Sequence, residues 1–302
     1  MHPTLVVITG PTAVGKTNLC VELAQHFNCD IVSADSRQFF KELSIGTAKP
    51  STEEMQNVTH HFVDSHSIQT PYNVNDFEQD VLTLLPQLFS ENPVVILTGG
   101  SGLYIDAICD GFDKNLPEGN NIIRTKLEEL YNKYGIELLQ EKLKQLDPTF
   151  YQEIDLSNLK RLYRAIEVCM LSGKPYSELR KGLKQERPFR TIKIALNRDK
   201  EELYDRINLR VDLMMQEGLL TEVENVNQYR SQNALKTVGY RELFDYLDKN
   251  VSLEEATEKI KINTRRYAKK QLAWFNRSNN YKWFNPNSKK DIIAFIESEL
   301  KS

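Results

Sequence analysis

Short apolar runs and amphipathic stretches alternate in the first part of the chain. Residues 4–9 and 94–98 are continuous apolar and β-branched runs, each followed by glycine, and this pattern predicts strands that are buried on both faces. Apolar residues recur at helical spacing within residues 16–27, and residues 30–34 form another short β-like run. Strand–helix–strand order with buried strands predicts a parallel sheet with right-handed crossovers.

The pattern changes in the middle of the chain. From residue 121 to 170 the apolar residues follow helical spacing, and no strand signal occurs. A further strand is expected at 191–196, and after it the pattern is again mostly helical. We therefore expect an α/β fold in which residues 1–115 and 189–302 form a parallel sheet core flanked by helices. Residues 116–188 are expected to form an all-helical insertion domain.

The composition narrows the class of protein. The chain has 302 residues, of which 40% are hydrophobic and 27% are charged, so it can bury a sizeable core and is not disordered throughout. Its net charge of −3 argues against a simple basic nucleic-acid coat protein. The apolar runs are too short to span a bilayer, and the first residues lack the cationic and apolar regions of a secretory signal. We expect a cytoplasmic protein that does not bind a membrane.

Two groups of potential metal ligands give no metal signal. The four cysteines are Cys20, Cys29, Cys109 and Cys169. They form no CxxC pair and no zinc spacing, so we expect small core residues in a reducing compartment. His60, His61 and Asp64 look like a cluster, but adjacent strand residues point to opposite faces and no further ligand has a suitable spacing. Structural roles are expected for these residues too.

The strongest chemical signal is a phosphate-binding loop between the first expected strand and the first expected helix. It consists of Gly10, Pro11, Thr12, Ala13, Val14, Gly15, Lys16 and Thr17, and it fits G-x-x-x-x-G-K-[ST]. Glycines let the backbone wrap around phosphate oxygens, and the amides with the helix N-terminus supply positive potential. Lys16 would reach the outer phosphate, and the Thr17 hydroxyl would ligate Mg²⁺. The core is therefore expected to be P-loop NTPase-like, and a ligand-free glycine turn is the alternative.

Asp35 follows the second expected strand. A carboxylate at the carboxyl end of a parallel strand, beside the phosphate loop, lies where such sheets bind ligands. The side chain could coordinate Mg²⁺ through water, act as a general base, or cap a helix. Position alone leaves these three roles open.

The motifs along the chain together resemble the tRNA dimethylallyltransferase (tRNA isopentenyltransferase) family. In order they are GPTAVGKT at 10–17, DSRQ at 35–38, IGTAKP at 45–50, HHFVD at 60–64, GGSGLY at 99–104, KRLYRAIEV at 160–168, LYDRINLRVDLMMQEGLLTEV at 203–223, KTVGYRE at 236–242 and TRRYAKKQLAWF at 264–275. The resemblance covers nearly the whole chain, and IGTAKP, GGSGLY and VGYRE are its most specific parts. Two positions depart from the family: Ser101 replaces threonine but keeps a hydroxyl, and Asn276 replaces arginine and removes a candidate phosphate contact.

The resemblance implies an activity. Such an enzyme transfers the dimethylallyl group of dimethylallyl diphosphate to the exocyclic N6 amine of the adenosine 3′ of the anticodon, giving isopentenyladenosine and diphosphate. The phosphate loop then binds a leaving group, and Mg²⁺ is the expected cofactor. The partners are the anticodon stem-loop of tRNA and dimethylallyl diphosphate. No obligate protein partner is expected, and the chain is expected to act as a monomer.

The resemblance also implies roles for single residues. Asp35 is the candidate general base, and an ordinary carboxyl pKa of about 3.9 would keep it ionised without tuning. Lys16, Thr12 and one arginine are the other catalytic candidates. Arg206 and Arg210 lie four apart on one helix face, and either can clamp diphosphate; Arg206 is favoured, and a solvated helix face is the alternative. The implied tRNA-binding residues are Asp35, Ser36, Arg37, Gln38, Ser101, Arg124, Lys160, Arg161, Arg164, Lys236, Arg241, Lys269, Lys270, Gln271 and Trp274.

Two local stretches are basic although the whole chain is acidic. Residues 156–190 hold nine Lys or Arg and three Glu, and residues 261–282 hold seven Lys or Arg and no acid. Aromatic residues lie between the cations of the second stretch, which suits backbone contacts and base stacking in RNA. A solvated basic helix with buried aromatics fits the same pattern, and the family resemblance favours tRNA binding by the C-terminal part.

Two other enzyme classes share part of this signal. A P-loop small-molecule or nucleotide kinase would also need the phosphate loop, and the helical insertion could act as its lid. An adenylate isopentenyltransferase would share the chemistry without needing the basic, aromatic C-terminal segment. A switch-type NTPase lacks support because no DxxG motif is suitably placed, and a prenyl-chain synthase lacks its DDxxD cluster.

Overall fold

The computed structural model describes residues 2–111, 116–180, 182 and 184–301, and these include a six-stranded sheet. The strands are β1 (Thr4–Thr9), β2 (Ile31–Ser33), β3 (His60–His61), β4 (Val94–Gly99), β5 (Arg190–Leu196) and β6 (Lys282–Phe284). Their order is β3-β2-β4-β1-β5-β6, and each neighbouring pair is parallel. The carboxyl ends of all these strands therefore meet at one edge of the sheet, which is where such folds bind ligands.

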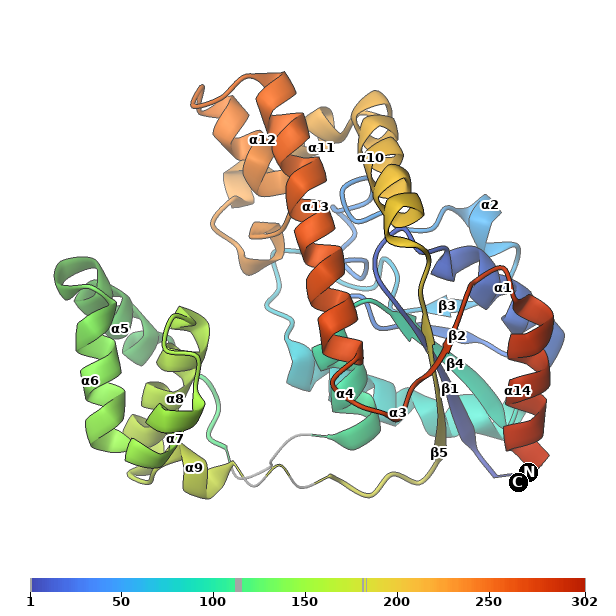
Figure 1. Ribbon diagram of the computed structural model, residues 1–302, viewed down its shortest axis with the longest axis horizontal. Helices are drawn as coiled ribbons and strands as arrows, with labels where there is room; N and C mark the ends of the chain where they lie inside the picture. Colours follow the sequence, from blue (N-terminus) through green and yellow to red (C-terminus); the bar gives the residue numbers. More distant parts are fainter. Residues whose placement is uncertain (1, 112–115, 181, 183, 302) are drawn as a thin grey trace. The chain divides into compact units, whose positions relative to one another are not determined.

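The chain forms two compact units, and each has its own helices (Figure 1). The α/β unit comprises Met1–Cys109 and Arg187–Ser302, and the helical unit comprises Asp110–Glu186. The helices outside the helical unit are α1 (Lys16–Phe27), α2 (Thr52–Met55), α3 (Val74–Glu91), α4 (Gly102–Asp110), α10 (Lys200–Gln216), α11 (Leu219–Asn225), α12 (Tyr240–Leu247), α13 (Leu253–Phe275) and α14 (Lys289–Lys301), with 3-10 turns η1 (Asn227–Tyr229) and η2 (Asn233–Leu235). The helical unit holds α5 (Asn121–Tyr134), α6 (Ile136–Leu146), α7 (Pro148–Glu153), α8 (Leu159–Ser172) and α9 (Tyr176–Leu179).

The α/β class with a parallel sheet flanked by helices is confirmed. The compact helical unit runs from residue 110 to 186, compared with the expected insertion at 116–188, and its described residues contain no strand. The strands β3 and β6 were missing from the sequence interpretation. They have two and three residues, too few for a period-of-two pattern to stand out.

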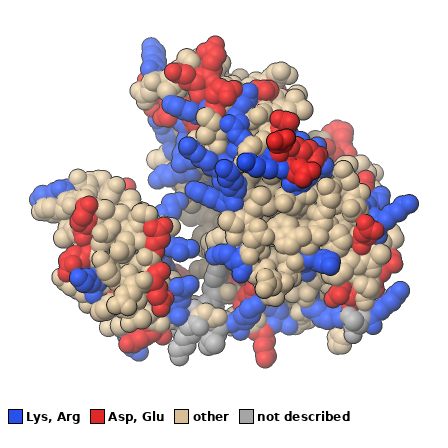
Figure 2. Space-filling view, viewed as in Figure 1, with Lys and Arg blue, Asp and Glu red and all other residues tan. Residues whose placement is uncertain are grey.

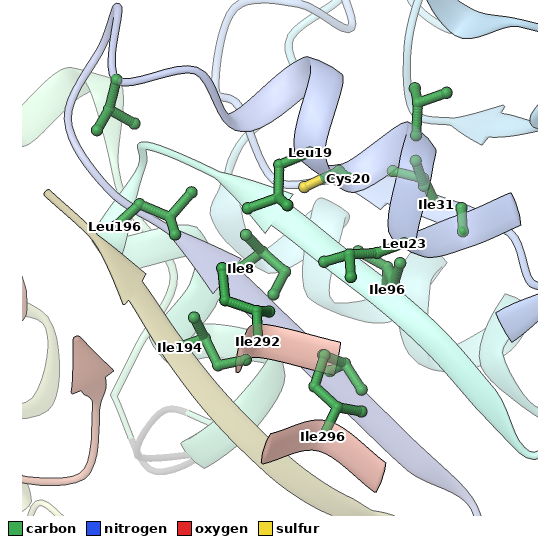
Figure 3. Packing of buried hydrophobic residues seen from close by; sticks show 14 of the residues in the cluster. Ile8, Leu19, Cys20, Leu23, Ile31, Ile96, Ile194, Leu196, Ile292 and Ile296 are labelled. Carbon is green, nitrogen blue, oxygen red and sulfur yellow. The ribbon is translucent and has the colours of Figure 1, made fainter. Parts of the chain in front are cut away.

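The sheet is covered on both faces, which explains its apolar strands. Leu5 and Val7 of β1 pack with α3 and α4, whereas Val6 and Ile8 pack with α1 and α14. Successive strand residues point to opposite faces, so both sets must be apolar. Figure 3 shows the second layer, in which isoleucines of β1, β4, β5 and α14 meet the leucines of α1. The four cysteines are buried, as expected for small core residues.

The helices after β5 form a further layer. Helices α10–α13 share a core with the segment around residues 39–45, and Tyr240 and Phe39 are fully buried in it. This layer lies together in Figure 1, in yellow and orange, and it supplies side chains to the ligand edge of the sheet. Among the described residues, no helix combines the length and apolar character that crossing a membrane requires.

Candidate active site and nucleic-acid interface

The phosphate loop joins β1 to α1, and the side chain of its lysine folds back over it. Lys16 Nζ donates hydrogen bonds to the carbonyl oxygens of Gly10, at 2.9 Å, and Pro11, at 2.8 Å. Desolvation and, to a smaller extent, the charge of Arg210 lower the pKa of Lys16 to about 8, and Asp35 opposes the shift. The Lys16 ammonium group therefore binds neutral carbonyl oxygens of its own loop. An anionic diphosphate oxygen would be a stronger acceptor for it.

Three arginines border the same loop. Arg206 Nε donates to the carbonyl of Ala13 at 2.8 Å, and Arg210 Nη1 lies 3.4 Å from the hydroxyl oxygen of Thr12. Both project from α10, as the four-residue spacing predicted. Burial and the neighbouring Arg206 lower the pKa of Arg210. These guanidinium groups bring positive charge to the place where the family resemblance expects a diphosphate.

The third arginine, Arg198, was missed by the sequence interpretation. Its Nε donates to the carbonyl of Val14 at 2.7 Å, and its other nitrogens bind Glu202 at 2.5 Å and Asn287 at 3.1 Å. It comes two residues after β5, a position at the ligand edge of the sheet that could have identified it. Arg198 also lines an open cavity of about 380 Å³ together with Asn276, so a cation lies near the position where the family resemblance expects an arginine.

Asp35 lies directly beside the phosphate loop. It follows β2, is half-buried, and its Oδ1 accepts a hydrogen bond of 2.9 Å from the Arg37 amide. Burial raises its pKa, and the Arg37 amide and Lys16 act against that shift. The expectation of an ordinary, untuned carboxyl pKa is therefore wrong: this carboxylate is in a desolvated place, and nearby donors and charge stabilise its ionised form.

Asp35 shares a small cavity with the phosphate loop. The cavity has a volume of about 50 Å³ and is lined by Lys16, Thr17, Cys20, Ser33, Asp35, Gln38, Pro50, His60, Val63, Thr98 and Gly99. The structure thus brings together three of the predicted site residues, Lys16, Thr17 and Asp35. Hydroxyl and carboxylate oxygens in this lining are ligands of the type that Mg²⁺ prefers.

The glycine-rich segment at 99–102 is shaped by α13. Gln271 donates from Nε2 to the carbonyl of Gly100 at 2.9 Å and accepts from the amide of Thr12, also at 2.9 Å. A Cβ on Gly100 would lie 2.1 Å from Gln271 Nε2, so a larger residue there would have to displace the Gln271 amide group. Gln271 is buried and occupied by these two contacts, which join α13 to the phosphate loop. Its predicted contact with tRNA stays a prediction.

Ser101 and the DSRQ segment also meet. Ser101 Oγ accepts a hydrogen bond of 3.1 Å from the amide of Ser36, and the two hydroxyl oxygens lie 3.2 Å apart. Arg37 donates to the carbonyls of Ser36 and Asn233 at 2.8 and 3.2 Å. These two segments therefore form one connected wall next to Asp35.

Helix α13 carries a basic surface on its exposed side. Lys269 and Lys270 are exposed, and Figure 2 shows Lys and Arg side chains gathered where α13 lies. Other cations of this stretch are engaged: Lys261 binds Asp212 at 2.8 Å, and the Arg277 guanidinium lies 3.8 Å from the Trp274 ring centroid. The indole Nε1 of Trp274 donates to Asp106 at 3.0 Å. Lys236, directly after η2, and Arg241, in the first turn of α12, are also exposed.

The arginines of the helical unit have a different environment. Glu167 is fully buried, and it binds Arg124 Nε and Arg164 Nη1, each at 2.8 Å. It also accepts from the amide of Asn120 at 2.6 Å. Arg124 and Arg164 therefore neutralise a buried acid, which favours a structural role, whereas Lys160 and Arg161 are exposed. All four residues stay predictions as tRNA contacts.

The HHFVD segment makes structural contacts. His61 Nε2 lies 2.8 Å from Asp30 Oδ2, and His60 Nδ1 lies 2.9 Å from the Val58 carbonyl oxygen. Asp64 pairs with Lys49. Among the described residues, no three His, Cys, Asp or Glu side chains converge as a metal site.

Known proteins resemble this chain over nearly its full length. The IPP transferase family model matches residues 38–278. A tRNA dimethylallyltransferase of Flavobacterium johnsoniae is 51% identical over 99% of this chain and 98% of its own, and tRNA dimethylallyltransferase 1 of Bacteroides thetaiotaomicron is 48% identical over 97% and 95%. The solved structure of the tRNA isopentenylpyrophosphate transferase of Bacillus halodurans is 36% identical, has a TM-score of 0.74, and covers 99% of this chain and 97% of its own. With its phosphate loop, its carboxylate at the strand ends and these relatives, the chain belongs to the IPP transferase family.

Proposed function

We propose that this chain is a tRNA dimethylallyltransferase. It transfers the dimethylallyl group of dimethylallyl diphosphate to the exocyclic N6 amine of the adenosine that follows the anticodon. The observation that carries the proposal is the shared cavity of Lys16 and Asp35, which puts a phosphate-binding cation beside a carboxylate in a member of this family. A kinase needs no such base for an aromatic amine, and an adenylate isopentenyltransferase needs no basic α13.

The phosphate loop serves the leaving group. Cleavage of the bond between the allylic carbon and oxygen moves its electron pair to the diphosphate, and positive charge develops on carbon. Lys16, Arg206 and Arg210 supply donors where that negative charge grows, and this preorganisation lowers the barrier. Arg206 is exposed and donates to a neutral carbonyl oxygen, so it can exchange this hydrogen bond for a stronger one to a diphosphate oxygen.

Asp35 serves the acceptor. The amine nitrogen forms a bond to the allylic carbon and must lose one proton, because otherwise it would keep a positive charge. A carboxylate in the cavity can take that proton, and its raised pKa brings it closer to the range in which a general base works well. The target base is stacked in its loop and must be extruded to reach this carboxylate.

The lining of the cavity fits Mg²⁺. Thr17 and Asp35 offer oxygen ligands of the kind that Mg²⁺ prefers, and Mg²⁺ usually completes its coordination with phosphate oxygens and water. When bound, Mg²⁺ would neutralise charge on the diphosphate. Thr17 would hold it directly, and Asp35 is near enough in the lining to hold it through water.

Exposed cations support tRNA binding by α13. Lys269 and Lys270 suit phosphate contacts, and Tyr267, whose side chain is 40% exposed, lies near Ser101 and Gln271 at the active-site end of the helix. We infer that α13 receives the anticodon stem-loop and that Ser36 and Ser101 border the extruded nucleotide. A tRNA acceptor agrees with the expected cytoplasmic location.

Mass spectrometry of tRNA nucleosides tests the proposal directly. The purified chain is incubated with tRNA, dimethylallyl diphosphate and Mg²⁺, and isopentenyladenosine is expected. Parallel reactions omit the diphosphate, replace tRNA with adenosine monophosphate, or replace the allylic substrate with ATP. Prenylation of the free nucleotide at the same rate would favour the adenylate enzyme, and ATP turnover without any prenylated nucleoside would favour a kinase.

A further inference from the structure

The loop at residues 44–48 is held by a carboxylate from another part of the chain. Glu222 of α11 accepts hydrogen bonds from three successive amides: Ser44 at 2.9 Å, Ile45 at 2.7 Å and Gly46 at 2.9 Å. Three converging amides form a concave anion site, and here the protein fills it with its own side chain. The contact joins segments 178 residues apart in sequence.

Tyr240 completes this contact. The Tyr240 hydroxyl donates to Glu222 Oε1 at 2.6 Å, and the ring is fully buried. Burial and the neighbouring carboxylate raise the pKa of Tyr240, so the hydroxyl stays protonated and remains a donor. A Cβ on Gly46 would lie 2.7 Å from the ring, which explains glycine at this position of the loop. Tyr240 therefore fixes both the carboxylate and the loop.

The same loop fixes a residue of the active-site cavity. Gln38 donates from Nε2 to the carbonyls of Thr47 at 3.2 Å and Ala48 at 3.1 Å, and its Oε1 accepts from Ser33 Oγ at 3.3 Å. Gln38 lines the cavity that holds Asp35 and Lys16. Contacts thus run without interruption from Glu222 through the loop to the amide of Gln38.

We propose that Glu222 is a positioning residue for the acceptor side of the active site. It holds the loop at 44–48, and through it Gln38, in the arrangement that the extruded adenosine meets beside Asp35. This inference rests on the proposed function and adds a residue outside the cavity to it. The phosphate loop is tied to Lys16 and three arginines, so loss of Glu222 would leave the diphosphate side unchanged.

The test compares Glu222→Gln with Glu224→Gln. Both changes remove one negative charge from α11, but Glu224 is exposed, and the amides of Ser44, Ile45 and Gly46 donate to Glu222 instead. A glutamine at 222 can accept with only one of its two terminal atoms, so at least one amide or the Tyr240 hydroxyl loses its partner. We expect kcat for tRNA prenylation to fall about 10- to 100-fold, as for a small misplacement of reacting groups. Binding of inorganic diphosphate, measured by calorimetry, should stay within about twofold of wild type.

Two further variants address the loop without changing Glu222. Tyr240→Phe keeps the ring and removes one hydrogen bond, so it carries the test if Glu222→Gln does not fold; a smaller loss of kcat in the same direction is expected. Gly46→Ala pushes the loop against the Tyr240 ring and should reproduce the Glu222→Gln result. In each case kcat for tRNA should change while diphosphate binding does not.

The possible results separate the two proposals. A wild-type chain that makes no isopentenyladenosine rejects the proposed function and the role of Glu222 with it. If the wild type makes the product and Glu222→Gln performs like Glu224→Gln, the role of Glu222 is wrong and the proposed function stands. Equal loss of diphosphate binding and turnover would show a general structural effect and would also overturn the positioning role.

Discussion

The phosphate loop and the helical unit use arginine in opposite ways. Around the loop, Arg206 and Arg210 bind a carbonyl and a hydroxyl oxygen, and no ion pair among the described residues involves either of them. In the helical unit, Arg124 and Arg164 both bind the buried Glu167. All four carry the same charge, and all four were predicted to bind a substrate.

The two pairs of arginines differ in the contacts that each would have to give up in order to bind a ligand. A guanidinium that holds only neutral oxygens can exchange them for the stronger contacts of a diphosphate. One that neutralises a buried carboxylate cannot leave, because an unpaired charge would remain in the interior. We therefore expect changes at the loop to reduce catalysis, and changes at Glu167 and its partners to reduce the stability of the helical unit.

The largest effect is expected for Asp35→Asn, which tests whether the chemistry resides at the loop. The change keeps shape and hydrogen-bonding capacity but removes the base, so kcat should fall about 10²–10⁴-fold while both substrates still bind. Single-turnover assays with tRNA and dimethylallyl diphosphate measure the rate. Rescue by excess Mg²⁺ would instead assign Asp35 to metal binding.

The pH dependence of activity in the wild type and in Asp35→Asn gives a second test of the general-base role. Because burial raises the pKa of Asp35, kcat/KM of the wild type should fall with decreasing pH at a higher pH than for a solvent-exposed aspartate. Because the pKa of Lys16 is about 8, a second fall is expected as the pH rises through about 8 and the lysine loses its charge. Asp35→Asn should remove only the acidic limb. An acidic limb that persists in the variant would contradict the general-base role.

Arg206→Ala should give the next largest effect. Loss of one preorganised donor to developing charge costs about 10²–10³-fold in rate, and the melting temperature should change little because Arg206 is exposed. Arg124→Ala is the matched change in the helical unit, where diphosphate binding should be unaffected. Comparable losses of diphosphate affinity in both variants would remove the distinction between the two sets of arginines.

Arg164→Ala tests the other side of the comparison. Glu167 keeps Arg124 but loses one charged donor in a buried place, so the helical unit should be destabilised by about 1–3 kcal/mol. Hydrogen exchange of the α8 amides measures the change, since it reports on this unit separately. Arg161→Ala, an exposed residue of the same helix, is the control and should stay within about 0.5 kcal/mol.

The sequence predicted the parts of this molecule that rest on local patterns. β1 and α1 have the predicted bounds, because an apolar run and a P-loop motif fix them within a few residues. The loop and the position of Asp35 were found in the same way, whereas the site role of the arginines of α10 came from the family resemblance. Two residues that hold loops of the site were not found: Arg198, which binds the phosphate loop, and Glu222, which binds the loop at 44–48. They reach these contacts only through the fold, across 184 and 178 residues of chain. The prediction of an ordinary pKa for Asp35 was wrong because desolvation depends on packing, which no local pattern records.

The smallest expected effect concerns the basic surface of α13. Like Arg206 and Arg210, its lysines Lys269 and Lys270 form no ion pair among the described residues. Lys269 and Lys270 are exposed on this helix, so a double change to glutamine should leave stability and single-turnover chemistry unaltered. tRNA affinity should decrease, and the slope of its logarithm against the logarithm of salt concentration should become shallower by roughly 0.7–0.9 per lost phosphate contact. Filter-binding titrations between low and moderate salt measure that slope. Lys290→Gln with Lys301→Gln, on α14, removes the same charge from two exposed lysines elsewhere on the α/β unit and serves as the control. A slope that changes equally in both double variants would show a general effect of net charge and would place the tRNA contact away from α13.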